Sequence, residues 1–224
     1  DELKKDNPKN KFTVGIIDDV THTSIDYDAG FDITDKDTVS ALFYGLGADG
    51  TVSANKNSIK IIGENTPMSA QGYFVYDSKK SGSQTVSHLR FGKLPQKAPY
   101  LIDKADFIAC HKFSFIYKMD LLQKAKPGST FLLNSSFGAG EVWDQLPGMM
   151  QQQLIAKQIK MYVIDADAVA DAVGMGGQKK KKKETCFFGM SGVLPREEAI
   201  TKIKEAFQKK KKKKGKEILE LNFK

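Results

Sequence analysis

The stretch "TVSALFYGLGADGTVSANKNSIKIIGE", residues 38–64, decides the expected fold. Its first ten residues are almost continuously apolar, as in a strand that is buried on both faces. Three glycines (Gly45, Gly47 and Gly50) then crowd a turn, and residues 51–63 carry apolar side chains near helical spacing. The stretch therefore predicts a strand, a glycine-rich turn and a helix in succession.

Outward from this stretch, strand-like runs continue to alternate with helix-like runs. Apolar, aromatic and β-branched runs predict strands, and amphipathic runs predict helices. Strands are expected at 11–17, 38–47, 71–80, 85–92, 105–111, 129–136 and 160–166. Helices are expected at 51–63, 113–125, 165–175 and 195–208, and residues 140–159 predict a short helix, a Pro-Gly break and a longer helix. This order predicts an α/β fold, a three-layer sandwich whose largely parallel or mixed central sheet is covered by helices on both faces.

Length and composition bound the organisation. The chain has 224 residues, 40% of them apolar, which is enough for one sizeable core. It contains no run of eighteen apolar residues, so no membrane partner is expected. The start, "DELKKDNPKNKF", has neither a methionine nor an apolar signal region, and reads as part of a longer protein. Residues 1–11 are polar and read as a linker, and residues 12–224 read as one domain.

Cysteine and histidine usage argues against a metal centre in this chain. Cys110 and Cys186 lie far apart, and no CxxC pair is present for an iron–sulfur cluster or a cysteine-ligated zinc. Both lie among apolar residues, which predicts buried, reduced thiols and a reducing compartment. His22, His88 and His111 share no metal-ligand spacing and are interpreted as structural.

The basic character is confined to two runs. Lys179–Lys183 and Lys209–Lys214 supply eleven positive charges, and without them the net charge of +8 becomes mildly negative. Solvated natural loops and altered sequence are both open explanations for these runs. No aromatic residues interleave with the lysines, so nucleic acid is not expected as a partner.

The glycine turn is the candidate binding site. Glycines let backbone N–H groups approach a phosphate, and the following helix adds its positive N-terminal end. Thr51 could cap the helix or bond a phosphate oxygen, Lys56 follows one turn later, and Lys79 and Lys80 follow a strand that could reach the same edge. The GxGxxG form alone is weak evidence. A turn whose glycines serve only packing remains the alternative.

Several long blocks then carry a family resemblance. They are "FTVGIIDDVTHTSIDYD", "FYGLGADGTVSANKNSIKIIGE", "QGYFVYDSKKSGSQTVSHLRFG", "TFLLNSSFG…EVWDQLP" and "TCFFGMSGVLPREEAITKIKEA". In this order they resemble the gamma-type (third) domain of pyruvate:ferredoxin (flavodoxin) oxidoreductases, members of the 2-oxoacid:acceptor oxidoreductase family. The resemblance covers about residues 12–224.

The resemblance implies a role in binding coenzyme A. The family's glycine loop matches Gly47, Ala48, Asp49, Gly50 and Thr51, its basic loop matches Lys79 and Lys80, and an asparagine near the domain's end matches Asn222. The parent enzyme would convert pyruvate to acetyl-CoA and CO2 and pass electrons to ferredoxin or flavodoxin. Thiamine diphosphate, Mg and [4Fe–4S] clusters are expected on other domains, so the catalytic centre is expected outside this chain.

The resemblance also sets expectations for partners. These are the other domains or subunits of the same enzyme, a homodimer, and a cytoplasmic or anaerobic-organelle location. The alternative is a structural or assembly module without a ligand, in a related 2-oxoacid oxidoreductase or in a sulfite reductase subunit.

Overall fold

The computed structural model describes residues 2–17, 20–28, 30–47, 49–77 and 83–168, together with 187, 189, 190, 197, 198, 200–202 and 205. The chain divides into two compact units, Asp1–Lys36 and Asp37–Lys224. The two units therefore meet after Lys36, whereas the sequence analysis places the domain boundary after residue 11. The boundary at residue 11 stays a prediction.

The first unit contains little regular structure. A 3-10 helix, η1 (Glu2–Lys4), is followed by the strands β1 (Thr13–Val14) and β2 (Ser24–Ile25), which pair in parallel. The expected strand at 11–17 is therefore wrong in extent, since only two of its residues pair. Val14 and Ile17 are exposed, so the described residues of this unit offer no packed face that would support a longer strand.

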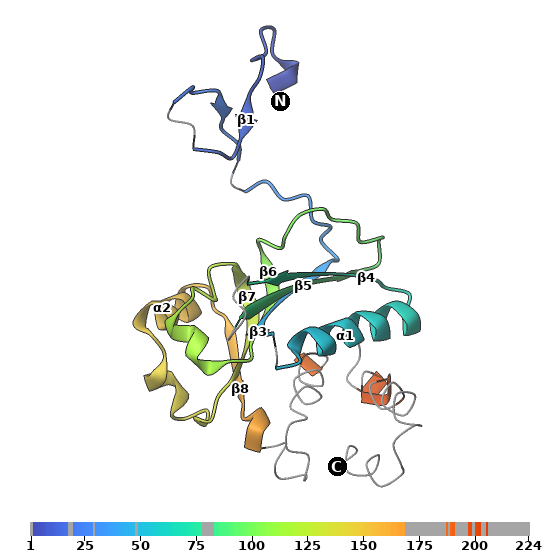
Figure 1. The fold of residues 1–224 in the computed structure, drawn as a ribbon, viewed down its shortest axis with the longest axis vertical. Coiled ribbons are helices and arrows are strands. Elements are labelled where there is room, and N and C mark those ends of the chain that lie inside the picture. The colour runs from blue at the N-terminus through green and yellow to red at the C-terminus, as the bar shows by residue number, and fades with distance from the viewer. Residues whose placement is uncertain are drawn as a thin grey trace. The chain divides into compact units, whose positions relative to one another are not determined.

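The second unit is built on a six-stranded sheet with the order β4-β5-β3-β6-β7-β8 (Figure 1). Its strands are β3 (Val39–Leu46), β4 (Ser69–Tyr76), β5 (Gln84–Gly92), β6 (Ala105–Cys110), β7 (Ala125–Asn134) and β8 (Lys160–Ile164). β3, β6, β7 and β8 run parallel, while β5 runs antiparallel to both β3 and β4. The expected mixed sheet of an α/β fold is confirmed.

Helices cover both faces of this sheet. The helix α1 (Thr51–Asn65) lies on one face, and α2 (Gly148–Ala156) with the 3-10 helices η2 (Phe113–Tyr117) and η3 (Val142–Gln145) lies on the other (Figure 1). Successive residues of β3 point to opposite faces, so Ala41 and Phe43 pack on the α1 side and Leu42 and Tyr44 on the α2 side. The continuous apolar run at 38–47 is explained by this two-sided burial.

Phe187 adds to the core on the α1 side. Its ring centroid lies 5.1 Å from that of Phe43 and 5.2 Å from that of Phe107, both in edge-to-face geometry. Aromatic rings favour this arrangement, because the positive edge of one ring meets the negative face of the other.

Two further helices were expected near the end of the chain. The segment expected at 195–208 is helical at each of its described residues. The one expected at 165–175 is described only at its start, where residues 166–168 are helical.

The helix expected at 113–125 is wrong. Only the short helix η2 forms, and β7 already begins at Ala125. The pairs Phe115/Ile116 and Leu121/Leu122 are all buried on the same side of the sheet, yet the pairs are six residues apart. Six residues rotate an α-helix by about 240°, so one continuous helix could not bury both pairs on one face.

The segment "KPG", residues 126–128, lies inside β7. The register between β6 and β7 shifts between Ala105 and Phe107, which is the mark of a bulge. Gly128 has φ 73° and donates its N–H to the Lys157 carbonyl at 2.7 Å. Proline and a left-handed glycine are tolerated in a strand at such an interruption.

The loop between β5 and β6, residues 93–104, covers β5 and β4 on the α2 side of the sheet. Gln71 of β4 exchanges two hydrogen bonds with the backbone of Ala98, and His88 Nδ1 of β5 accepts the Ile102 N–H at 3.1 Å. The buried Arg90 guanidinium lies 4.9 Å from the Tyr100 ring centroid. The loop is therefore held by side chains of the sheet that it covers.

Candidate functional site at the carboxyl edge of the sheet

The glycine turn follows β3 at the edge where all four parallel strands end. The register pairs Tyr44 with Cys110, Cys110 with Leu133, and Leu133 with Val163, so these strand ends are level. In open α/β sheets ligands bind outside the carboxyl ends of the strands. The turn predicted to bind phosphate therefore lies in the position where such a fold binds ligands.

The Asp49 carboxylate accepts hydrogen bonds from the backbone of the glycine turn. Its Oδ2 accepts the Leu46 N–H at 3.0 Å, and its Oδ1 accepts the Thr51 N–H at 2.8 Å. Burial raises the pKa of this carboxyl, but hydrogen bonds from Thr51 and Leu46 outweigh burial and lower the pKa. The turn thus already holds an anion, the carboxylate of its own Asp49.

The start of α1 depends on Gly50 and Gly45. Gly50 is the N-cap residue with φ 78°, a left-handed conformation that glycine adopts without strain. A Cβ added at Gly45 would collide with the Thr51 hydroxyl and lie 2.9 Å from Asp49 Oδ2. The absence of a side chain at Gly45 and Gly50 therefore lets α1 begin close to the end of β3.

Thr51 bonds to His111 instead of capping the helix. The expectation of a Thr51 cap is wrong, because Gly50 occupies the N-cap and Asp49 Oδ1 accepts the N–H of Thr51 itself. The Thr51 hydroxyl lies 2.7 Å from His111 Nδ1, and both residues are buried. The turn after β3 is thereby joined to the end of β6.

Asn134 continues this set of contacts across the edge. Its Nδ2 donates to the His111 carbonyl at 3.4 Å, and its Oδ1 accepts the Ala166 N–H at 3.0 Å. Sequence reasoning did not single out Asn134, although a polar residue that ends a buried apolar run was a usable signal. The carboxyl edge therefore carries a continuous polar row of Asp49, Thr51, His111 and Asn134.

The remaining predicted residues are only partly described. Gly47 donates its N–H to the Ser83 carbonyl at 2.9 Å, which fixes the turn against the start of β5. Lys56 does not point to the turn, since its Nζ lies 5.3 Å from the ring centroid of Phe74 on β4. Ala48, Lys79, Lys80 and Asn222 lie outside the described residues.

Other sequence-based expectations concern thiols, metals and membranes. Cys110 is a buried thiol, as expected, while Cys186 lies outside the described residues. Among the described residues no group of three or more His, Cys, Asp or Glu side chains could hold a metal ion. Within the same residues, no helix is both long enough and apolar enough to cross a bilayer.

Comparison with known proteins shows the family of the chain. The family model for pyruvate ferredoxin/flavodoxin oxidoreductase matches residues 40–224. The chain is also 56% identical over 224 residues to the pyruvate-flavodoxin oxidoreductase of Trichormus variabilis. This match covers 100% of the chain but only 19% of that relative. The chain belongs to the pyruvate ferredoxin/flavodoxin oxidoreductase family, and the resemblance seen in the sequence is confirmed.

Two solved structures share the fold. One is the pyruvate oxidoreductase subunit PORC of Thermotoga maritima, with a TM-score of 0.63 at 14% identity over 84% of this chain and 92% of that chain. The other is the 2-oxoglutarate:ferredoxin oxidoreductase of Magnetococcus marinus, with 2-oxoglutarate, coenzyme A and succinyl-CoA bound. Its TM-score is 0.61 at 17% identity, over 84% of this chain and 29% of that chain. The fold is thus found both as a separate subunit and within a longer chain.

Proposed function

We propose that this chain is the part of a pyruvate:ferredoxin or pyruvate:flavodoxin oxidoreductase that helps to bind coenzyme A. The observation that carries the proposal is the family match over residues 40–224, which includes the whole carboxyl edge of the sheet. The parent enzyme would decarboxylate pyruvate oxidatively, with thiamine diphosphate, Mg and [4Fe–4S] clusters on its other domains. Coenzyme A would supply the thiol that accepts the acetyl group.

The geometry of the turn restricts where a phosphate of coenzyme A could bind. The N–H groups of Leu46 and Thr51 already donate to the Asp49 carboxylate. By helix geometry, the next N–H groups of the first helical turn, those of Val52 and Ser53, have no partner within α1 and would be available at its positive end. We expect the pyrophosphate on this outer side of the turn, where it does not displace the Asp49 carboxylate.

Lys79, Lys80 and Asn222 would complete the site, as the family resemblance implies. Two ammonium groups offset the charge of a 3′-phosphate, and an amide can donate to a phosphate or to the adenine. The Magnetococcus marinus neighbour with coenzyme A bound shares the fold of this chain, which supports the same ligand class.

A purely structural role is the second candidate. It is favoured by the Asp49 carboxylate, which occupies the turn with an anion from the chain itself. In that role the row from Asp49 to Asn134 would only join the ends of β3, β6, β7 and β8. A ligand titration separates the two candidates.

The test is calorimetric titration of the full-length parent enzyme with coenzyme A and with 3′-dephospho-coenzyme A. The double variant Lys79→Glu/Lys80→Glu should weaken binding of coenzyme A by at least about tenfold, because attraction to the 3′-phosphate becomes repulsion. Its affinity for the dephospho form should change much less. The matched control is Lys93→Glu/Lys97→Glu, which reverses two exposed lysines of the loop after β5. Unchanged affinity in the first variant would favour the structural role.

A further inference from the structure

The chain changes direction across the sheet at the ends of β3 and β6, which are neighbouring parallel strands. From β3 the chain continues through α1 to β4 and β5 on one side, whereas from β6 it continues through η2 to β7 and β8 on the other. The helices α1 and η2 also lie on opposite faces of the sheet (Figure 1). In open α/β sheets, ligands bind in the crevice at such a point.

His111 lies at this point, directly after β6, and is buried. Its N–H donates to the Tyr44 carbonyl at 2.8 Å, and its Nδ1 lies 2.7 Å from the Thr51 hydroxyl. Its carbonyl accepts a hydrogen bond from Asn134 Nδ2 at 3.4 Å. His111 therefore contacts the end of β3, the start of α1 and the end of β7 at the same time.

Thr51 connects His111 to the backbone groups that could bind an anion. It is the first residue of α1, so the N–H groups of Val52 and Ser53 belong to the same helical turn and move with it. The Thr51 N–H donates to Asp49 at 2.8 Å, and the Thr51 hydroxyl contacts His111. The position of the first turn of α1 therefore depends on two contacts, of which only the one with His111 reaches another strand.

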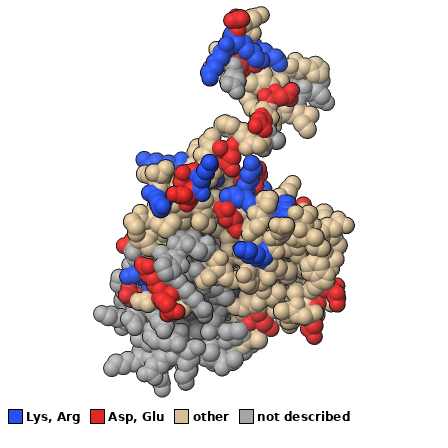
Figure 2. Space-filling view, turned by 180° about the vertical axis from the view of Figure 1, so that it is seen from behind, with Lys and Arg blue, Asp and Glu red and all other residues tan. Residues whose placement is uncertain are grey.

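Ion pairs bring charges of this unit together at the opposite, amino edge of the sheet. Figure 2 shows blue and red side chains next to one another on this unit. Three ion pairs lie where β3, β6 and β7 begin: Lys93–Asp37, Lys124–Asp103 and Lys126–Asp106. Residues 45–55, in contrast, include no lysine or arginine. A phosphate at the glycine turn would therefore be held there by backbone N–H groups, whose direction depends on where α1 begins.

We propose that His111 is a positioning residue for coenzyme A. Through Thr51, it holds the first turn of α1 in the place where the N–H groups of Val52 and Ser53 bind the pyrophosphate. This role of His111 rests on the proposed function, because it belongs to the same site. Donors that are fixed before the ligand arrives bind it more tightly than donors that must first be ordered. Removal of the His111 contact should therefore weaken coenzyme A binding more than pyruvate binding.

The first experiment measures the KM for coenzyme A and the KM for pyruvate in the full-length parent enzyme. The variant His111→Phe keeps a ring and removes both ring nitrogens. Its KM for coenzyme A should rise at least about fivefold, because the donors are misplaced, and its KM for pyruvate should rise far less. The matched control is His88→Phe, since His88 is also buried and its Nδ1 accepts the Ile102 N–H. An equal rise of the coenzyme A KM in both variants would overturn the role of His111.

A second pair of variants tests rescue, and serves if the phenylalanine variant does not fold. The amide of His111→Asn lies as many bonds from Cα as Nδ1 does, whereas the amide of His111→Gln lies one bond further, as Nε2 does. The asparagine variant can keep the contact with Thr51, so its KM for coenzyme A should stay within about twofold of wild type. The glutamine variant should resemble His111→Phe. Equal KM values for the asparagine and glutamine variants would contradict the role of His111.

The variant Ser53→Glu separates this role from the proposed function. Ser53 is exposed in the first turn of α1, where a carboxylate favours the helix but repels a phosphate. Its KM for coenzyme A should therefore rise without loss of stability. A rise in Ser53→Glu with a wild-type KM in His111→Phe would leave the proposed function standing and overturn the role of His111. No rise in either variant would overturn both.

Discussion

The Thr51 hydroxyl and His111 Nδ1 lie 2.7 Å apart, which joins the first residue of α1 to the residue that follows β6. The two residues are 60 positions apart in the sequence, and both are buried. A polar contact in this position costs stability when one partner is removed, because the other loses its hydrogen bond inside the protein.

We therefore expect Thr51→Val to destabilise the chain by about 1–3 kcal/mol, since it removes the hydroxyl at nearly constant volume. Thr51→Ser keeps the hydroxyl and loses only a methyl group, so its cost should be about 1 kcal/mol. Urea unfolding followed by circular dichroism measures both. A valine variant as stable as wild type would mean that this hydrogen bond contributes nothing.

His88 should make stability depend on pH. Burial, together with the charges of Lys124 and Arg90, lowers the pKa of His88 from 6.5 to about 4. Between these values the unfolded chain binds a proton that the folded chain excludes, so this contribution is complete above pH 6.5 and is lost as the pH falls to 4. The variant His88→Gln removes the titration and retains an acceptor for the Ile102 N–H.

The measurement for His88 is the urea midpoint of wild type and His88→Gln at several pH values between 6.5 and 4. The wild-type midpoint should fall more steeply than that of the variant. Parallel curves would show that His88 has a similar pKa in both states.

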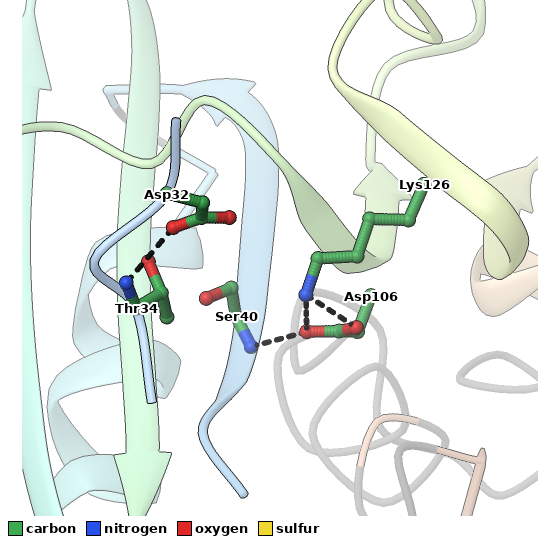
Figure 3. Close-up of polar contacts among 5 residues, drawn as sticks. All are labelled: Asp32, Thr34, Ser40, Asp106 and Lys126. Carbon is green, nitrogen blue, oxygen red and sulfur yellow. Dashed lines mark hydrogen bonds and ion pairs between the residues drawn. The ribbon is translucent and has the colours of Figure 1, made fainter. Parts of the chain in front are cut away.

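Asp106 and Lys126 hold the bulge at the amino end of β6 and β7. The Lys126 ammonium lies 2.8 Å and 2.9 Å from the two carboxylate oxygens of Asp106, and the Ser40 N–H also donates to this carboxylate at 2.8 Å (Figure 3). Figure 3 also shows the local turn in which the Thr34 N–H donates to Asp32 at 2.8 Å. Among the described residues, Asp106 thus has two partners, whereas Lys126 has one.

We expect Lys126→Met to cost at most about 1 kcal/mol, since the ion pair is partly exposed. Asp106→Ala should cost more, about 1–3 kcal/mol, because it also leaves the Ser40 N–H without an acceptor. A double-mutant cycle measured by chemical unfolding gives the coupling between the two side chains. Equal costs for the two single variants would argue against the role of the Ser40 contact.

Two glycine-to-alanine substitutions should have opposite effects. Gly45→Ala forces a Cβ into the Thr51 hydroxyl and toward Asp49, so it should destabilise the chain and shift the start of α1. Gly63 lies in α1 with nothing within 4 Å of an added Cβ, so Gly63→Ala should stabilise the chain by about 0.5–1 kcal/mol. Thermal unfolding of both variants checks the pair. A Gly45→Ala variant as stable as wild type would show that the strand and helix have room to separate.

The sequence predicted the elements whose patterns are local. β3 and α1 appear where the apolar run and the helical spacing of residues 38–64 place them, and the mixed α/β sheet follows from the order of such runs. The family was also readable, because long blocks matched in order over most of the chain. The helix at 113–125 was predicted wrongly, because the apolar residues of this crossover resemble the buried face of a helix. In the structure, residues 115–116 and 121–122 are buried on one side of the sheet at a spacing that a single helix does not allow.

By itself, the sequence determined the succession of strands and helices, the glycine turn and the apolar core, because these depend on propensities and periods within short windows. Only the tertiary structure decided which polar groups meet. The strand order β5-β3-β6-β7 brings Thr51 to His111 and His111 to Asn134. The bend of the turn places the Asp49 carboxylate against the backbone N–H groups of Leu46 and Thr51. These pairings depend on the register of strands far apart in the chain, and no local pattern records that register.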